Sequence, residues 1–188
     1  HKLLAGLSQA SQILVQESQT RKLDRYRFNE SYLMHTSTSP QYAIIASCDV
    51  AASMMEAPGG TALVQESLQE ARDFRRAMRK VEQEYDGSWW FRVWGPDNLS
   101  SGKALRQEEW MLHADEKWHG FGPVEPGFNM LDPIKATIVT PGLDIEGEFA
   151  GSGIPAAVVT KYLAEHGVVV EKTGLYSFFV MFTIGITK

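Results

Sequence analysis

The sequence has very little cysteine, and its composition is that of an ordinary globular protein. Only one of its 188 residues, Cys48, is a cysteine, which excludes an internal disulfide and a zinc site built from several cysteines. Cys48 lies in the apolar run YAIIASCDVAA, so we expect a buried small residue rather than an activated thiol. Such sparse cysteine is typical of a reducing compartment, and we expect a cytoplasmic protein.

The sequence also lacks a long hydrophobic run and an excess of positive charge. Its longest apolar run, LYSFFVMFTIGIT over residues 175–187, is shorter than the about 20 residues that a membrane-spanning helix needs. The formal net charge is −5, and no Lys/Arg-rich block offers the basic surface that nucleic acid requires. We therefore expect neither a membrane nor a nucleic acid as a partner.

The two ends of the sequence lack the features of a natural start and stop. The first residue is His1 rather than methionine, and the last apolar run ends abruptly at Lys188. No charged segment followed by an apolar core and a cleavage site marks a secretory signal. We expect a piece of a longer protein.

What the sequence does contain is a regular succession of helix and strand patterns. Apolar residues recur at steps of three and four along residues 61–85 and predict a long helix, with Thr61 as its N-cap and charged residues such as Arg75 on a solvated face. The other predicted helices span residues 27–36, 43–56 and 154–167, and the predicted strands span residues 8–16, 88–94, 134–140, 168–174 and 175–187. This order predicts the end of an α/β domain over residues 1–58, followed by a long linking helix and a smaller α+β lobe over residues 59–188.

The opening segment, HKLLAGLSQAS, carries the most specific motif. A lysine beside a histidine is by itself usually a solvated surface residue. Here two variable residues, two small residues, one further residue and the group Ser-Gln-Ala-Ser follow His1-Lys2. This arrangement resembles the pyridoxal 5'-phosphate (PLP) attachment motif of the bacterial inducible ornithine/lysine/arginine decarboxylases. Later segments resemble the same family in the same order across nearly the whole chain: RFNESYLMHTSTSPQYAIIAS, WHGFG, MLDPIKATIVTPG, GIPAAVVTKYLAEHGVVVEKTG and FFVMFTIGIT.

The resemblance implies a fold, a reaction and a cofactor. The fold is the aminotransferase-like fold type I, with this chain covering the end of the PLP-binding major domain and most of the small lobe. The reaction is the decarboxylation of a basic amino acid to a diamine and CO2. Lys2 would form the Schiff base with the cofactor aldehyde, for which a lysine with a perturbable pKa is suited. His1 would contact the cofactor phosphate or relay a proton, although a purely structural contact is an equal alternative.

The hydroxyl run Thr36-Ser37-Thr38-Ser39 is the second candidate element of the site. By itself, such a run before Pro40 is typical of a turn. The resemblance implies that Ser37, or Thr38 one residue later, reaches the cofactor phosphate of the neighbouring subunit. It therefore implies a homodimer with a shared active site, and members of the family also form larger rings of dimers and consume protons during acid stress.

Glu171, in the segment VVVEKTG, is the candidate for substrate binding. A lone glutamate at a strand end is usually solvated. In the lysine and ornithine members, the resemblance places an acidic residue here against the distal ammonium of the substrate, and a carboxylate pairs well with a compact cation. We expect lysine as the first substrate and ornithine as the second, with arginine still open.

The residues argue against three other interpretations. His113 and His119 are six residues apart, which is not the spacing of a helical zinc site, so no metal is expected. A non-catalytic assembly protein with the same fold would not need Lys2, and a PLP aminotransferase would not show this order of motifs. The partners of the cofactor ring are expected upstream of His1, so the isolated 188-residue piece is expected to be inactive.

Overall fold

The structure is a computed structural model that describes residues 6–7, 10, 13–85, 90–96, 106–142 and 149–185. The chain divides into two compact units, His1–Leu63 and Val64–Lys188, which are described separately. No helix in these described ranges is long and apolar enough to cross a membrane.

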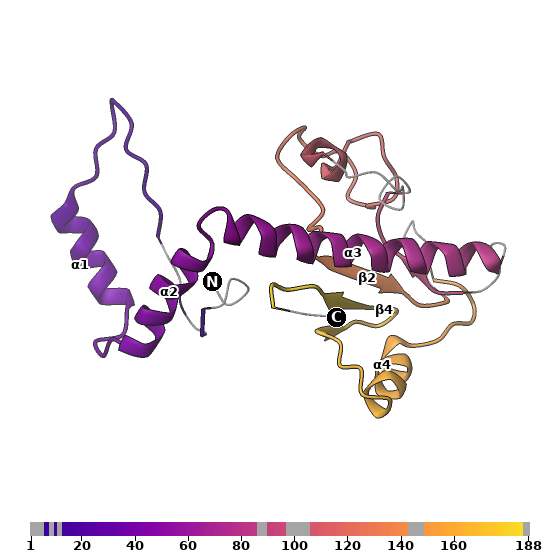
Figure 1. The fold of residues 1–188 in the computed structure, drawn as a ribbon. Helices are drawn as coiled ribbons and strands as arrows, with labels where there is room; N and C mark the ends of the chain where they lie inside the picture. The colour runs from indigo at the N-terminus through magenta and orange to yellow at the C-terminus, as the bar shows by residue number, and fades with distance from the viewer. Residues whose placement is uncertain are drawn as a thin grey trace. The chain divides into compact units, whose positions relative to one another are not determined.

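The first unit contains two helices and the start of a third (Figure 1). Helix α1 (Arg25–His35) begins at Asp24, whose carboxylate accepts the N–H groups of the second and third residues that follow it. Helix α2 (Tyr42–Met54) follows, and α3 (Gly59–Glu84) starts in this unit. The predicted helices are confirmed here within two residues at each end. Thr61 lies inside the first turn of α3 and is not its N-cap, and Cys48 is half-buried rather than buried.

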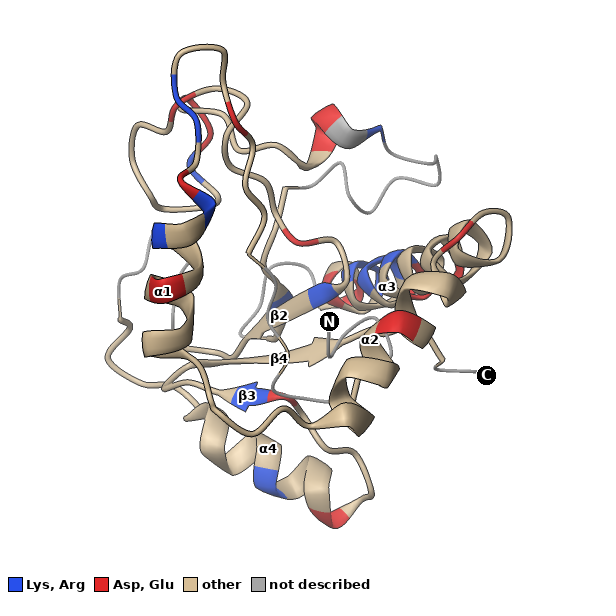
Figure 2. Ribbon diagram, turned by 90° about the vertical axis from the view of Figure 1, so that its left-hand side faces the viewer, with Lys and Arg blue, Asp and Glu red and all other residues tan. Residues whose placement is uncertain are grey.

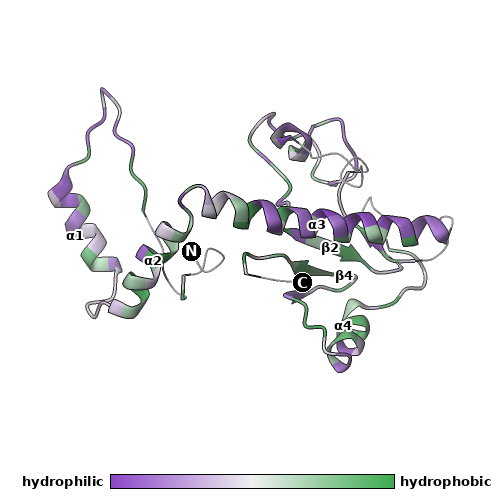
Figure 3. Ribbon diagram, in the orientation of Figure 1, coloured by the Kyte–Doolittle hydropathy of each residue, from purple (hydrophilic) through white to green (hydrophobic). Residues whose placement is uncertain are grey.

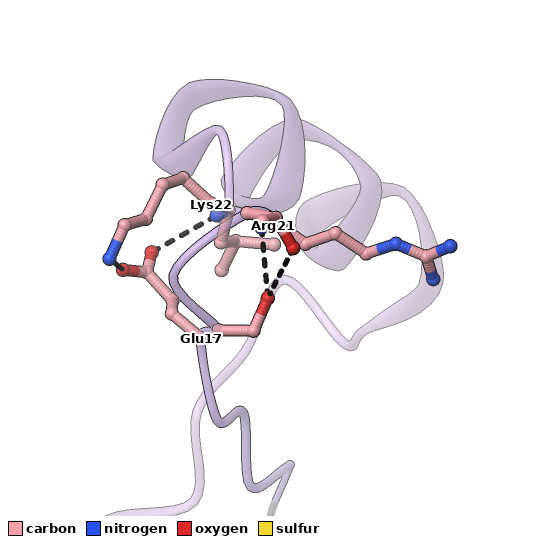
Figure 4. Close-up of polar contacts among 6 residues, drawn as sticks. Glu17, Arg21 and Lys22 are labelled. Carbon is pink, nitrogen blue, oxygen red and sulfur yellow. Dashed lines mark hydrogen bonds and ion pairs between the residues drawn. The ribbon is translucent and has the colours of Figure 1, made fainter.

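A polar turn precedes α1 and is closed by Glu17 (Figure 4). The Glu17 carboxylate accepts the N–H of Leu23 at 3.0 Å and lies 3.6 Å from Lys22 Nζ. Ser18 Oγ accepts the N–H of Arg21 at 2.9 Å, and Ser18 N–H donates back to Arg21 O. These contacts close the turn that leads the chain into α1.

The strand predicted over residues 8–16 is wrong in its described part. Ile13–Gln16 has no regular secondary structure, and Leu14 is 90% exposed. An extended segment becomes a strand only when its backbone groups pair with another strand. No other described segment pairs with Ile13–Gln16, so the β-forming side chains do not decide its structure.

The second unit is built on a four-stranded antiparallel sheet in the order β1-β2-β4-β3. The strands are β1 (Arg92–Val93), β2 (Lys135–Val139), β3 (Lys172–Thr173) and β4 (Ser177–Met181). Each is shorter than its prediction. Strand β4 ends at Met181 because a turn at Ile184 and Gly185 follows, with Gly185 at φ 89°, a value that favours glycine.

The core of the second unit lies on one face of this sheet. Ile138 of β2 and Phe178 of β4 are paired residues, and both are nearly fully buried together with Ala156. Helix α3 contributes Phe74 and Met78 to the cluster, and α4 (Ala156–Glu165) contributes Val159 and Leu163. Figure 3 shows β2 and β4 as strongly hydrophobic strands, drawn between the amphipathic α3 and α4. The predicted helix α4 is confirmed, with Pro155 at its N-cap and Gly167, at φ 82°, just beyond its end.

A second hydrophobic cluster lies in the segment between β1 and β2. Trp110, Leu112, Trp118 and Leu131 are buried together, with Trp94 and Val124 packed against them. A short 3-10 helix (Gln107–Trp110) and an isolated antiparallel bridge between Met111 and Met130 support this cluster. None of these elements has a regular periodicity in the sequence.

The prediction that Arg75 lies on a solvated face is wrong. Charged residues line α3 (Figure 2), but Arg75 is only 2% exposed. Its Nη1 donates to Trp94 O at 3.1 Å, and its Nη2 donates to Lys135 O at 2.6 Å. Burial lowers the pKa of Arg75 from its ordinary value to about 10, and the nearby Asp132 carboxylate partly offsets this effect. Because the pKa of Arg75 is lower in the folded protein than in the unfolded one, the free energy of unfolding should rise with pH only above about pH 10. At neutral pH the guanidinium stays charged.

Replacing Arg75 by alanine should lower the free energy of unfolding by about 2–4 kcal/mol, because two carbonyl groups would lose charged donors. Urea unfolding measures this change. Lys80→Ala, on the exposed side of the same helix, is the matched control and should change stability by less than about 0.5 kcal/mol. Equal unfolding midpoints for the two variants would contradict the role of Arg75 as the link between α3 and the sheet.

Candidate functional site

One described residue of the lysine motif, Leu7, contacts α2. His1 and Lys2 lie outside the described residues. Gly6 is buried, and Leu7 N–H donates to Ser47 Oγ at 3.0 Å. Ser47 Oγ donates in turn to Ile44 O at 2.7 Å. Leu7 is therefore held on α2 by Ser47, a residue that the sequence pattern does not single out.

The hydroxyl run forms an exposed turn between α1 and α2. Ser37 and Thr38 are both exposed. Ser37 Oγ accepts the N–H of Ser39 at 3.2 Å, a contact typical of serine turns. The turn expected from the residues alone is thus confirmed. The role of Ser37 or Thr38 toward a phosphate stays a prediction.

An open cleft of about 680 Å³ lies beside this turn in the first unit. Its lining includes Thr36, the residue before Ser37, and the residues Phe28 and Tyr32, whose rings stack with centroids 6.4 Å apart. The His35 ring shares the cleft and bonds to Ser31 O at 2.7 Å through Nδ1, which is a donor because a carbonyl oxygen only accepts. The remaining lining residues are Ile13, Asn29 and Ser31. The sequence offered no signal for this cleft, which combines aromatic rings with small polar groups.

The chemistry of this turn fits a phosphate group. Ser37 Oγ already accepts a backbone N–H, so its own hydroxyl proton remains to be donated to an anionic oxygen. Thr38 and Ser39 offer further hydroxyl groups on the same exposed turn. Hydrogen bonds to a charged acceptor are stronger than those between neutral groups. The turn therefore presents hydroxyl groups that are chemically able to donate hydrogen bonds to an anionic oxygen.

Glu171 lies in the second unit, at the start of the β3–β4 hairpin. Its N–H donates to Phe179 O at 3.1 Å, and its side chain is exposed. The next residues, in β3, pair with Phe178 and Phe179 of β4. Thr173 Oγ1 bonds to Thr160 Oγ1 of α4 at 3.3 Å. The backbone of Glu171 is thus well held, while its carboxylate is accessible to a ligand. Because Ser37 and Glu171 belong to different units, each is placed only within its own unit.

His119 has a structural role. It is buried, its Nε2 donates to His113 O at 2.9 Å, and its Nδ1 accepts the N–H of Phe121 at 3.1 Å. Its ring also packs edge-on against Trp118 and stacks on Phe121. Both ring nitrogens form hydrogen bonds within the protein, and the ring packs against Trp118 of the tryptophan cluster. Within the described ranges, no three His, Cys, Asp or Glu side chains gather as a metal site would require.

Comparison with known proteins gives a consistent result over the full chain. The family model described as Orn/Lys/Arg decarboxylase, major domain, matches residues 1–188. The lysine decarboxylase LdcA of Pseudomonas aeruginosa is 53% identical over 189 residues, which cover 100% of this chain and 25% of that protein. The inducible lysine decarboxylase of Escherichia coli K12 is 45% identical over 188 residues, again 100% of this chain and 25% of that protein.

More distant relatives and solved structures agree with these matches. The biodegradative arginine decarboxylase of Escherichia coli K12 is 42% identical, over 100% of this chain and 27% of that protein. The constitutive ornithine decarboxylase of the same organism is 34% identical, over 97% of this chain and 27% of that protein. The solved structure of lysine decarboxylase A from Pseudomonas aeruginosa has a TM-score of 0.84 and covers 98% of this chain and 25% of that one, at 53% identity. The present chain therefore spans about a quarter of the length of these proteins.

Proposed function

Because this chain belongs to the ornithine/lysine/arginine decarboxylase family, we propose that the full-length protein releases CO2 from a basic amino acid and forms a diamine. The observation that carries the proposal is the match of the family model to all of residues 1–188. Lysine is the first substrate, ornithine the second, and arginine remains open.

The preference for lysine is supported by two independent features. The relatives at 53% and 45% identity carry the name lysine decarboxylase, whereas the ornithine decarboxylase is at 34%. The exposed Glu171 carboxylate suits a compact ammonium group at the far end of the substrate. A guanidinium would also pair with this carboxylate, which is why arginine is not excluded.

PLP is the proposed cofactor, and it supplies an acceptor for the electrons left behind when CO2 departs. Lys2 is proposed to hold it covalently and to return a proton to the substrate Cα. His1 either contacts the phosphate or supports Lys2 structurally. Ser37, or Thr38 as the alternative, donates its hydroxyl proton to the phosphate oxygens. The small residues after Lys2 leave room for the cofactor beside the backbone.

The proposed site is shared between two subunits. Ser37 would act on the phosphate held by the neighbouring copy, so the active unit would be a homodimer, from which larger rings of dimers can form. The first unit would correspond to the end of an aminotransferase-like PLP domain and the second to a smaller lobe. The matched family model carries the name major domain over the whole chain, so this division remains a proposal, as does the cytoplasmic location.

Incubation of the full-length protein with lysine, ornithine and arginine separately tests this function. We expect PLP-dependent CO2 release in amounts equal to the diamine formed, fastest with lysine. A keto acid product would identify a transaminase and contradict the proposal. Binding of PLP without turnover of any of the three amino acids would favour a non-catalytic assembly protein.

A further inference from the structure

The β3–β4 hairpin that begins at Glu171 is bound at its tip by two other elements. Leu175 O accepts the N–H of Ala156, the first residue of α4, at 2.8 Å. Tyr176 O accepts the N–H of Thr140, just after β2, at 2.9 Å. The hairpin itself is closed by Gly174 N–H, which donates to Ser177 O at 2.6 Å. The position of the tip is thus set by the end of β2 and the start of α4.

A close contact between two glycines lies under this tip. A Cβ atom at Gly153 would come within 2.7 Å of Gly142 Cα, 2.7 Å of Pro141 O and 2.8 Å of Tyr176 Cε1. Gly142 has a φ of 110°, a conformation that favours glycine. The Tyr176 ring therefore rests directly against both glycine backbones. No side chain fits at Gly153 unless the ring or the backbone moves.

Two hydrogen bonds join the backbone segments that carry the two glycines. Ile154 N–H donates to Pro141 O at 2.8 Å, and Thr140 Oγ1 donates to Ile154 O at 2.7 Å. Thr140 is 1% exposed, so the hydrogen bond that its hydroxyl donates is shielded from water. The two segments that carry the glycines are consequently held as one rigid support for Tyr176.

The support is connected to Glu171 through the backbone of the hairpin. Glu171 N–H bonds to Phe179 O, and β3 pairs with β4 at Lys172–Phe179 and Thr173–Phe178. We therefore expect a displacement of Tyr176 to shift the start of β4 and, through these pairs, the backbone of Glu171. Packed elements transmit such shifts because they have little free volume to absorb them.

We propose that the Gly142–Gly153 contact, capped by the Tyr176 ring, positions the Glu171 carboxylate for the distal cation of the substrate and thereby sets substrate preference. This inference rests on the proposed substrate-binding role of Glu171. Tyr176 and the two glycines are positioning residues, because they act through the hairpin and not by contact with the substrate.

Gly153→Ala in the full-length protein tests this role. We expect roughly a tenfold rise in KM for lysine with a smaller change in kcat, because misplacing a binding group by a fraction of an ångström weakens its contact. The ratio of kcat/KM for lysine to that for ornithine should move toward the value for Glu171→Gln. Gly151→Ala is the matched control, since a Cβ there meets nothing within 4 Å, and it should behave as wild type.

Tyr176→Ala and Tyr176→Phe provide the same test without a backbone clash. Tyr176→Ala should raise KM for lysine by about as much as Gly153→Ala. Tyr176→Phe keeps the aromatic ring and should have wild-type kinetics. If Gly153→Ala does not fold, this pair carries the test. Folded Gly153→Ala or Tyr176→Ala protein with wild-type KM and substrate order would overturn the inference, as would an equal loss of kcat on all substrates without a change in KM.

Glu171→Gln, measured in parallel, separates the two proposals. If it changes substrate preference while Gly153→Ala and Tyr176→Ala do not, only the positioning inference fails. If it leaves preference unchanged, the binding role of Glu171 fails, and the positioning inference fails with it, whatever the results for Gly153→Ala and Tyr176→Ala.

Discussion

Replacing Lys2 by alanine in the full-length protein should abolish decarboxylation, with a fall in kcat of at least about a thousandfold. The physical reason is that one amine would both hold the cofactor and return a proton to the substrate, and loss of a positioned proton donor alone costs about 10²–10⁴-fold. Lys161→Ala, which removes an exposed lysine of α4, should leave the rate unchanged.

A chemical label identifies the attachment site independently of the rate. Borohydride reduction of the wild-type protein should fix PLP to a peptide that contains Lys2 and remove the visible absorbance of the bound cofactor. The Lys2→Ala protein should show neither the absorbance band nor the labelled peptide. A persistent band with labelling of another lysine would refute Lys2 as the cofactor anchor.

Glu171→Gln should reduce kcat/KM for lysine by about 10–100-fold, since the pairing of a carboxylate with an ammonium is worth about 1.5–3 kcal/mol more than no pairing. The loss should appear mainly in KM, because the distal ammonium does not change during the reaction. The preference for lysine over ornithine should weaken as well.

The control for this variant lies on α4. Glu165→Gln removes an exposed carboxylate near the end of that helix and should leave kcat/KM unchanged for both amino acids. If Glu171→Gln and Glu165→Gln have the same kinetics, Glu171 does not bind the substrate, and the distal group must be recognised elsewhere.

Local features were predictable because their causes lie within a few residues. The apolar steps along residues 61–85 became α3, and Gly167 ends α4 with the positive φ that glycine adopts without strain. The family was also predictable, since the motif around Lys2 is dense and the family model matches all of residues 1–188. The identity of Ser37 as a turn residue followed from its hydroxyl and the nearby proline.

Part of the candidate site could not be read from the sequence. The hydrogen bond between Leu7 and Ser47 and the cleft lined by Thr36 depend on contacts between segments that no local pattern encodes. Ile13–Gln16 has the residues of a strand but finds no partner among the described segments. Strand formation is a property of a pair, so one segment cannot establish it.

The sequence by itself determined the helices, the turns and the family, because side-chain periodicity, backbone preferences and motif spacing are all local. Only the tertiary structure decided that Arg75 is buried and that Gly153 is tightly packed. The sequence pattern places Arg75 on the charged face of its helix, whereas in the structure carbonyl groups 19 and 60 residues away accept hydrogen bonds from its guanidinium. No local pattern marks Gly153, which packs against Gly142 and Tyr176. In both cases the deciding atoms come from distant parts of the chain, and packing brings them together.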